Sequence, residues 1–105
     1  MSVDYKSALI YGYDCSHLIN KISWEDLEEL ENIGWDYIRD PYSDKFLYIG
    51  VKISCVDCYE ERIIDIFKAL NPTIHKFSEL IGKTPDGYKA LLPLSGSVYH
   101  ICYAT

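Results

Sequence analysis

Apolar and polar residues alternate along several stretches of the chain, the period expected when successive side chains of a strand point to opposite faces of a sheet. Four stretches have this pattern, and turn-forming residues separate them. The predicted strands are residues 6–13, 35–40, 45–53 and 98–103. Residues 88–94 are a further candidate strand, which Pro93 weakens because proline cannot donate a hydrogen bond to a neighbouring strand.

Two other stretches carry apolar residues at helical spacing. The first predicted helix spans residues 24–33, with Ser23 as its N-cap and Gly34 as its C-terminal stop. The second runs through residues 59–81 and is expected to break and restart at Asn71-Pro72, since proline removes a helical hydrogen bond. The residues of the first helix that are expected to face inward are Trp24, Leu27, Leu30 and Ile33.

The elements follow one another in the order β-α-β-β-α(α)-β, which is the order of the split βαβ arrangement of the ferredoxin-like fold. We therefore predict a single α+β domain over residues 1–105, with helices on one face of an antiparallel or mixed sheet. The first and third strands are expected to be parallel central neighbours whose carboxyl ends meet at one edge. In the third strand, the side chains predicted to face the helices are Leu47, Ile49, Val51 and Ile53.

Size and charge narrow the class of protein. A chain of 105 residues with 49% hydrophobic and 25% charged residues is typical of one globular domain. Its net charge is −6, and its ten Lys and Arg residues are scattered singly, so direct binding to nucleic acid or to an anionic membrane is disfavoured. We find neither a membrane-spanning run nor a signal peptide and expect a cytoplasmic protein with reduced cysteines.

The cysteines and one histidine suggest a metal site. Cys55-Val-Asp-Cys58 lies where the third strand is predicted to give way to a helix, and Cys15-Ser-His17 follows the first strand. Parallel neighbouring strands would bring these side chains together, and three thiolates with one imidazole form a known tetrahedral zinc set. One hypothesis is therefore a structural zinc held by Cys15, His17, Cys55 and Cys58. The other interpretation treats the cysteines as small buried apolar residues, with no cofactor.

The same C-x-x-C pair could instead cycle as a redox-active dithiol, since the N-terminus of a helix can activate a cysteine. The sequence context favours this redox interpretation less than the zinc hypothesis. The motif follows the third strand rather than the first, and Asp57 within it adds a negative charge that opposes thiolate formation.

The first predicted helix carries five carboxylates and neither lysine nor arginine. Glu25 and Asp26 lie in the first turn, where the helix dipole favours acids. Glu28, Glu29 and Glu31 have no such local reason and repel one another. The helix is either a solvated acidic face or a docking face for a basic groove, in the manner of a nucleic-acid mimic.

Aromatic residues are predicted on the sheet face opposite the helices. The chain has 10 tyrosines. Phe46 and Tyr48 point to this open side, where Tyr11 or Tyr13, Tyr99 and Tyr103 join them if the register allows. Tyrosine is enriched at protein interfaces. An RNA-binding platform would need basic residues that are missing here. We expect a face that binds protein or self-associates, or simply half-buried strand tyrosines.

No phosphate-binding glycine loop, nucleophile elbow or partnered catalytic histidine is found. We therefore expect a binding protein rather than an enzyme, for example an inhibitor of a nucleic-acid-processing enzyme that contacts a protein partner with a basic groove. The alternative is a metal-stabilised or dithiol module, and homo-oligomerisation is left open. The expected partner-contacting residues are Glu25, Asp26, Glu28, Glu29, Glu31, Phe46 and Tyr48.

Overall fold

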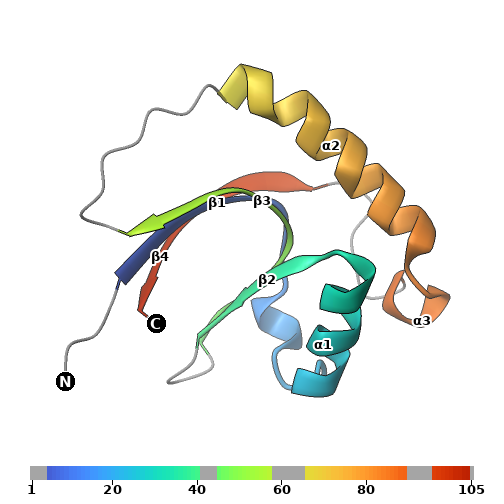
Figure 1. Cartoon of the computed structure of the whole chain (residues 1–105). Helices are drawn as coiled ribbons and strands as arrows, with labels where there is room; N and C mark the ends of the chain where they lie inside the picture. The colour runs from blue at the N-terminus through green and yellow to red at the C-terminus, as the bar shows by residue number, and fades with distance from the viewer. Residues whose placement is uncertain (1–4, 41–44, 58–65, 90–95, 105) are drawn as a thin grey trace.

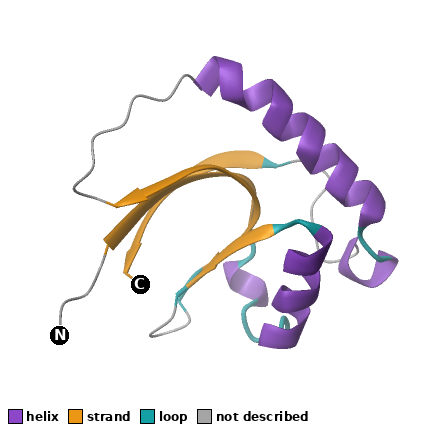
Figure 2. Cartoon of the chain, viewed as in Figure 1, coloured by secondary structure: helices purple, strands orange, loops and turns teal. Residues whose placement is uncertain are grey.

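Four strands form one strongly curved antiparallel sheet, with helix α2 lying along its convex side (Figure 1). The computed structural model describes residues 5–40, 45–57, 66–89 and 96–104. The strands are β1 (Tyr5–Asp14), β2 (Asp36–Arg39), β3 (Leu47–Asp57) and β4 (Ser97–Ala104). The helical segments are the 3-10 turn η1 (Ser16–Leu18) and the helices α1 (Trp24–Ile33), α2 (Ile66–Lys83) and α3 (Asp86–Lys89), drawn in purple in Figure 2.

The predicted α+β class is therefore confirmed, and the predicted sense of one strand pair is wrong. The strand order is β2-β3-β1-β4, and each neighbouring pair is antiparallel, including β1 with β3. A short connection joins β2 to β3, so these two strands run in opposite directions. β1 runs in the same direction as β2 and pairs with the other side of β3. The carboxyl ends of β1 and β3 consequently lie at opposite ends of the sheet.

Strand β3 is longer than the alternation predicts. Its pairing with β1 continues past Ile53, where the register shifts by one residue, as far as Asp57. An extra residue of this kind is a β-bulge, which bends and twists the strand. Cys55 therefore lies within the strand, opposite Ala8, and not at a strand-to-helix junction.

Helix α2 continues through Pro72, contrary to the predicted break. One side of the helix is buried directly after the proline, where Thr73, Phe77 and Leu80 are all covered by the rest of the domain. The Thr73 hydroxyl also donates a 2.7 Å hydrogen bond to the carbonyl oxygen of Ala69. Packing of this face against the sheet outweighs the one backbone hydrogen bond that Pro72 cannot make.

The chain after α2 differs from the prediction as well. Residues 86–89 form the short helix α3, so the first two residues of the candidate strand 88–94 are helical, and its residues 90–94 lie outside the described residues. The backbone N–H groups of Tyr88 and Lys89 both donate to the carbonyl oxygen of Pro85. Proline suits the first turn of a helix because its fixed φ is already helical.

The main core lies between the sheet and the helices. Leu47, Ile49 and Val51 point into it, as the alternation predicts, and meet residues of α1 and α2. Trp35 is 1% exposed, and its indole N–H donates a 2.8 Å hydrogen bond to the Thr84 hydroxyl. Thr84 in turn donates to the carbonyl oxygen of Leu80, so the buried polar groups of this pair are satisfied.

A second, smaller cluster covers the other face of the sheet. Its buried members are Ala8, Ile10, Ile38 and Ile101, and aromatic side chains pack around them. None of the helices in the described part of the chain is long and apolar enough to cross a membrane.

Candidate functional site

The acidic helix α1 is firmly anchored at both ends. The Ser23 backbone N–H donates to the Asp26 carboxylate at 3.0 Å, and the Asp26 N–H donates to the Ser23 hydroxyl at 3.1 Å. This reciprocal pair is a capping box. At the other end Gly34 adopts a φ of 128°, which favours glycine. Leu27 and Leu30 bury the inner side of the helix, so the predicted cap and stop are confirmed.

A tyrosine from a distant helix also binds α1. The Tyr88 hydroxyl of α3 donates to the Asp26 carboxylate at 2.9 Å and lies in hydrogen-bond contact with the Glu29 carboxylate. The two acceptors raise the pKa of Tyr88 far above its usual value, because its anion would face negative charge, with Glu29 the larger cause. Two of the five predicted contact carboxylates are therefore engaged within the protein itself.

Trp24 lies on the outside of α1, although its spacing predicts an inward position. Its side chain is 52% exposed. The Arg39 guanidinium lies over the indole ring, 4.4 Å from the ring centroid, and Tyr37 meets the same ring edge-on. Trp24 is the first residue of the helix and packs over β2 rather than into the core. The helical spacing of the apolar residues cannot show that Trp24 faces outward, because it does not show how far the sheet beneath the helix extends.

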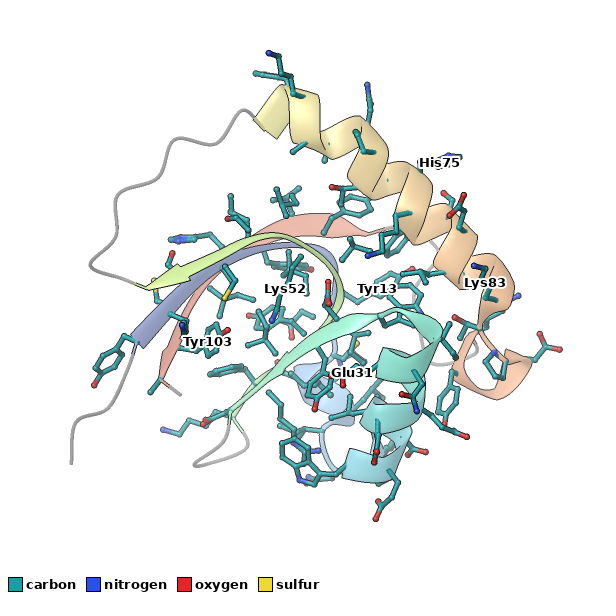
Figure 3. The ribbon with its side chains drawn as sticks, viewed as in Figure 1. Tyr13, Glu31, Lys52, His75, Lys83 and Tyr103 are labelled. Carbon is teal, nitrogen blue, oxygen red and sulfur yellow. The ribbon has the colours of Figure 1, made fainter. Side chains whose placement is uncertain are left out.

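The remaining carboxylates of α1 form what we call the acidic face, made of Glu25, Glu28 and Glu31. All three side chains are exposed, and no residue in the described ranges forms an ion pair with them. The side chain of Glu31 is labelled in Figure 3. Successive members of this set are three residues apart, the spacing of neighbours on a helix surface, so the acidic face is continuous.

The other candidate surface is the concave face of the sheet, on the side away from α2. Its aromatic residues are half-buried around the second cluster, and they are Phe46, Tyr48, Tyr99 and Tyr103. The rings of Tyr48 and Tyr99 lie 5.2 Å apart, which joins β3 to β4 above β1. The predicted open-side position of Phe46 and Tyr48 is therefore confirmed. Tyr11 and Tyr13 instead pack against Phe77 of α2 on the convex side.

Polar groups are interspersed on the concave face. The Tyr103 hydroxyl lies 3.3 Å from the Cys55 sulfur, and burial, followed by this contact, raises the pKa of Tyr103 well above its usual range. Lys52 lies opposite Ile10 in the register and points to the same side as Tyr103 (Figure 3). The face is therefore apolar at its floor and polar at its surface, which is common at protein interfaces.

The structure does not bring together Cys15 and Cys55 of the predicted zinc site. The Cys15 N–H donates to the carbonyl oxygen of Leu47 at the start of β3, whereas Cys55 is paired with Ala8 near its end. At roughly 3.3 Å per residue, this separates the two cysteines by about 25 Å along the strand. Cys58 lies outside the described residues. Convergence was predicted from parallel strands, and the antiparallel pairing removes that basis.

Cys15 and His17 also diverge from each other. Cys15 is 1% exposed within the core, whereas His17 is an exposed residue of η1. Burial, and then the nearby Asp14 charge, raises the pKa of the Cys15 thiol to about 12, so this thiol is protonated at neutral pH. In residues 5–40, 45–57, 66–89 and 96–104, no three His, Cys, Asp or Glu side chains are grouped so as to hold a metal ion.

The sequence pattern did not place two residues at the surface of α1, Tyr88 and Trp24. Tyr88 is 62 residues from Asp26, and no local signal links them. Trp24 shares the spacing of Leu27 and Leu30, so its place at the first position of the helix, directly after the N-cap, is the one signal that could have placed it at the surface.

Comparison with known proteins adds no family to this geometry: no protein-family model matches the chain, and neither a curated protein nor a solved structure is significantly similar to it.

Proposed function

We propose that this protein acts by binding a protein partner through the acidic face of α1, formed by Glu25, Glu28 and Glu31. The observation that carries the proposal is that these three exposed carboxylates have no cationic partner in the described part of the chain, although their helix is held rigidly. Mutual repulsion on a helix costs a few tenths of a kcal/mol for each close pair. A cationic groove on a partner would remove that cost and add steering between opposite charges.

The spacing of the acidic face suits a groove that normally binds nucleic acid. Glu25 and Glu31 are separated by six residues, or about 9 Å of helix rise. One strand of B-DNA presents a phosphate every 3.4 Å along its axis, so about three phosphates occupy a similar length. The concrete form of the proposal is an inhibitor that occupies the basic groove of a nucleic-acid-processing enzyme.

The contacts around α1 support this role. The capping box and Tyr88 fix the helix before binding, which lowers the entropy lost on association. Trp24 adds an exposed aromatic ring beside the carboxylates, and tryptophan is a frequent hot-spot residue at interfaces. Phe46 and Tyr48 are half-buried over the second cluster, so we assign the primary contact to α1 and a secondary one to the concave face.

We further propose that the domain is a form of the split βαβ arrangement of the ferredoxin-like fold. The β-α-β-β-α-β order of the main elements and the position of β3 between β1 and β2 support this topology. A cytoplasmic location is part of the same proposal. It is supported by Cys15, Cys55 and Cys102, which are all free thiols.

The experiment compares two variants of equal net charge. In the first, Glu25, Glu28 and Glu31 are replaced by glutamine; in the second, Asn20, Asn71 and Ser78 are replaced by lysine. Each raises the net charge by three, but only the first alters the acidic face, and the three positions in the second are exposed. The probes are purified DNA-cleaving and RNA-cleaving enzymes with basic grooves, assayed for inhibition by the native chain.

We expect the glutamine variant to lose at least about tenfold in inhibition and the lysine variant to retain it. Added double-stranded DNA should compete with the native chain for the enzyme, and inhibition should weaken as salt rises. If both variants lose inhibition equally, the effect is one of overall charge and the acidic face is not the contact. If no enzyme of either class is inhibited by the native chain, the nucleic-acid-mimic function is wrong.

A further inference from the structure

The two edges of the sheet are protected to very different degrees. β2 forms one edge with four residues and carries a charge at each end, Asp36 and Arg39. β4 forms the other edge with eight residues, and within the described chain it pairs with β1 on one side and with no strand on the other. Short length and charged residues are the usual means of preventing an edge strand from pairing with another chain. β2 has both, and β4 has neither.

The composition of β4 reinforces this contrast. Its sequence, Ser-Val-Tyr-His-Ile-Cys-Tyr-Ala, contains no Asp, Glu, Lys, Arg or Pro. Each of the other three strands contains at least two charged residues. In a chain with a net charge of −6, an uncharged strand is the segment on which two copies can meet with least repulsion.

Neither face of β4 is fully covered within the monomer. Helix α2 packs over β3 and β1, and on that side of β4 Val98 is 42% exposed and Cys102 is also exposed. On the concave side, Tyr99 and Tyr103 extend the aromatic surface as far as this edge. Apolar and aromatic surface therefore continues up to an edge with which no strand of the described residues pairs.

We propose that two copies of this protein pair through β4, antiparallel and about a two-fold axis perpendicular to the sheet, to form one continuous eight-stranded sheet. Such an isologous contact is self-complementary, because each copy presents the same edge. Pairing about the middle of the strand sets Tyr99 of one copy near Tyr103 of the other and keeps both concave faces on the same side. On the convex side it sets Val98, His100 and Cys102 of the two copies beside one another.

This self-pairing goes beyond the proposed partner contact and does not depend on it. The acidic face lies on α1, which packs against β2 at the opposite edge of the sheet. A dimer through β4 would therefore leave two acidic faces free, far from the two-fold axis. Loss of dimerisation and loss of enzyme inhibition are separately measurable, and each can fail while the other holds.

Sedimentation equilibrium of the full chain tests the proposal. We expect the mass to rise with concentration from that of one 12.1 kDa chain towards that of two. Val98→Lys with Cys102→Lys places like charges across the two-fold axis and should shift the dimerisation constant at least tenfold towards the monomer. The control, Asn71→Lys with Ser78→Lys on exposed positions of α2, adds the same charge and should dimerise as the native chain does.

A charge-swap experiment makes the test specific for the edge. The lysine variant should remain monomeric alone, and so should Val98→Glu with Cys102→Glu, while their mixture should form a heterodimer. Far-UV circular dichroism checks that each variant is folded. A native chain that stays monomeric up to about 1 mM overturns the proposal and leaves the edge for a strand of another protein. A dimer that persists unchanged in the lysine variant overturns it as well.

Discussion

Gly12 of β1 and Gly50 of β3 face each other across the sheet so closely that neither position has room for a side chain. A Cβ added to Gly12 would lie 2.2 Å from the carbonyl oxygen of Ile49, and one added to Gly50 would lie 2.2 Å from that of Tyr11. These neighbours are backbone atoms, which cannot rotate away as a side chain can. The two longest strands of the sheet therefore meet at a contact that only glycine permits.

Replacing Gly50 with alanine should lower the free energy of unfolding by about 2–4 kcal/mol, because the methyl group can be accommodated only by moving a strand. Gly12→Ala should have a similar effect. Urea denaturation followed by circular dichroism measures both. Gly82→Ala is the control, since no atom lies within 4 Å of its added Cβ and alanine is the better helix former in α2. A Gly50→Ala protein as stable as Gly82→Ala would show that the strands are not in this contact.

This glycine pair illustrates which parts of the fold a single sequence can predict. Features set by neighbours in the chain were predictable: Ser23 and Gly34 bound α1, and the alternation in β3 assigned Leu47 to the helix side. Features set by contacts between distant segments were not. Gly12 and Gly50 are isolated glycines in the sequence, and their pairing follows from the antiparallel sense of β1 and β3.

In the candidate sites, too, features set by neighbours in the chain were predictable and features set by distant contacts were not. The carboxylates of α1 are recognisable from the sequence, but the engagement of Asp26 and Glu29 by Tyr88 depends on how α3 folds back onto α1. The four-residue zinc hypothesis loses its geometric basis for a related reason, because β1 and β3 are antiparallel. Its spacing was local, but its convergence depended on a strand direction that Cys15 and Cys55 themselves do not encode.

Tyr13→Phe should stabilise the protein by about 1 kcal/mol at neutral pH. Tyr13 is 2% exposed, and its hydroxyl has no hydrogen-bond partner among the described residues, so folding removes it from water without compensation. The measurement is again urea denaturation. Tyr5→Phe, at a side chain that is 50% exposed, is the matched control and should leave stability unchanged. A destabilised Tyr13→Phe protein would mean that the hydroxyl has a partner.

Stability should also fall at alkaline pH. Burial, followed by the charges of Tyr11 and Cys15, raises the pKa of Tyr13 to about 12. Because the pKa of Tyr13 is higher in the folded chain than in the unfolded chain, the folded state favours the protonated Tyr13 hydroxyl over its anion. This contribution to stability is complete below about pH 10 and is lost as pH rises through the folded-state pKa. Tyr13→Phe should therefore reduce the alkaline loss without abolishing it. Other groups whose pKa is raised account for the remainder, namely Tyr48, Tyr88, Tyr103 and the Cys15 thiol.

The Asp26 cap gives the opposite dependence in acid. The Ser23 backbone N–H, then the Tyr88 hydroxyl and the Ser23 side chain, hold the pKa of Asp26 below its usual value. Because the pKa of Asp26 is lower in the folded chain than in the unfolded chain, the Asp26 carboxylate contributes to stability. This contribution is complete above the unfolded-state pKa of about 4 and is lost as pH falls through the folded-state pKa. Ser23→Ala should cost about 1 kcal/mol at pH 7 and less at pH 2.

The Tyr88 contact can be separated from the cap by NMR titration of the Asp26 carboxyl group. In Tyr88→Phe the pKa of Asp26 should rise towards its usual value while the Ser23 hydrogen bonds remain. Tyr37→Phe removes a hydroxyl elsewhere beside α1 and should leave the titration unchanged. Equal titration curves for native and Tyr88→Phe protein would show that α3 does not bind α1 in solution.

Alkylation of the thiols should follow their burial. Cys15 is 1% exposed with a pKa raised to about 12, whereas Cys55 and Cys102 are exposed. Because the thiolate is the reacting form, iodoacetamide at pH 8 should modify Cys15 about 100-fold more slowly than the other two, until urea unfolds the chain. Peptide mass spectrometry assigns each rate, and Cys15→Ala identifies the slow site.

Repeating the alkylation after treatment with a chelator distinguishes burial from metal protection. A zinc ion held jointly by Cys15 and Cys55 would shield both thiols, and removing it would raise both rates together. The separation of these residues along β3 predicts instead that Cys55 reacts fast with or without the chelator and that Cys15 stays slow in both. Joint release by the chelator would contradict the antiparallel pairing of β1 and β3, because only the parallel arrangement allows one ion to bind both.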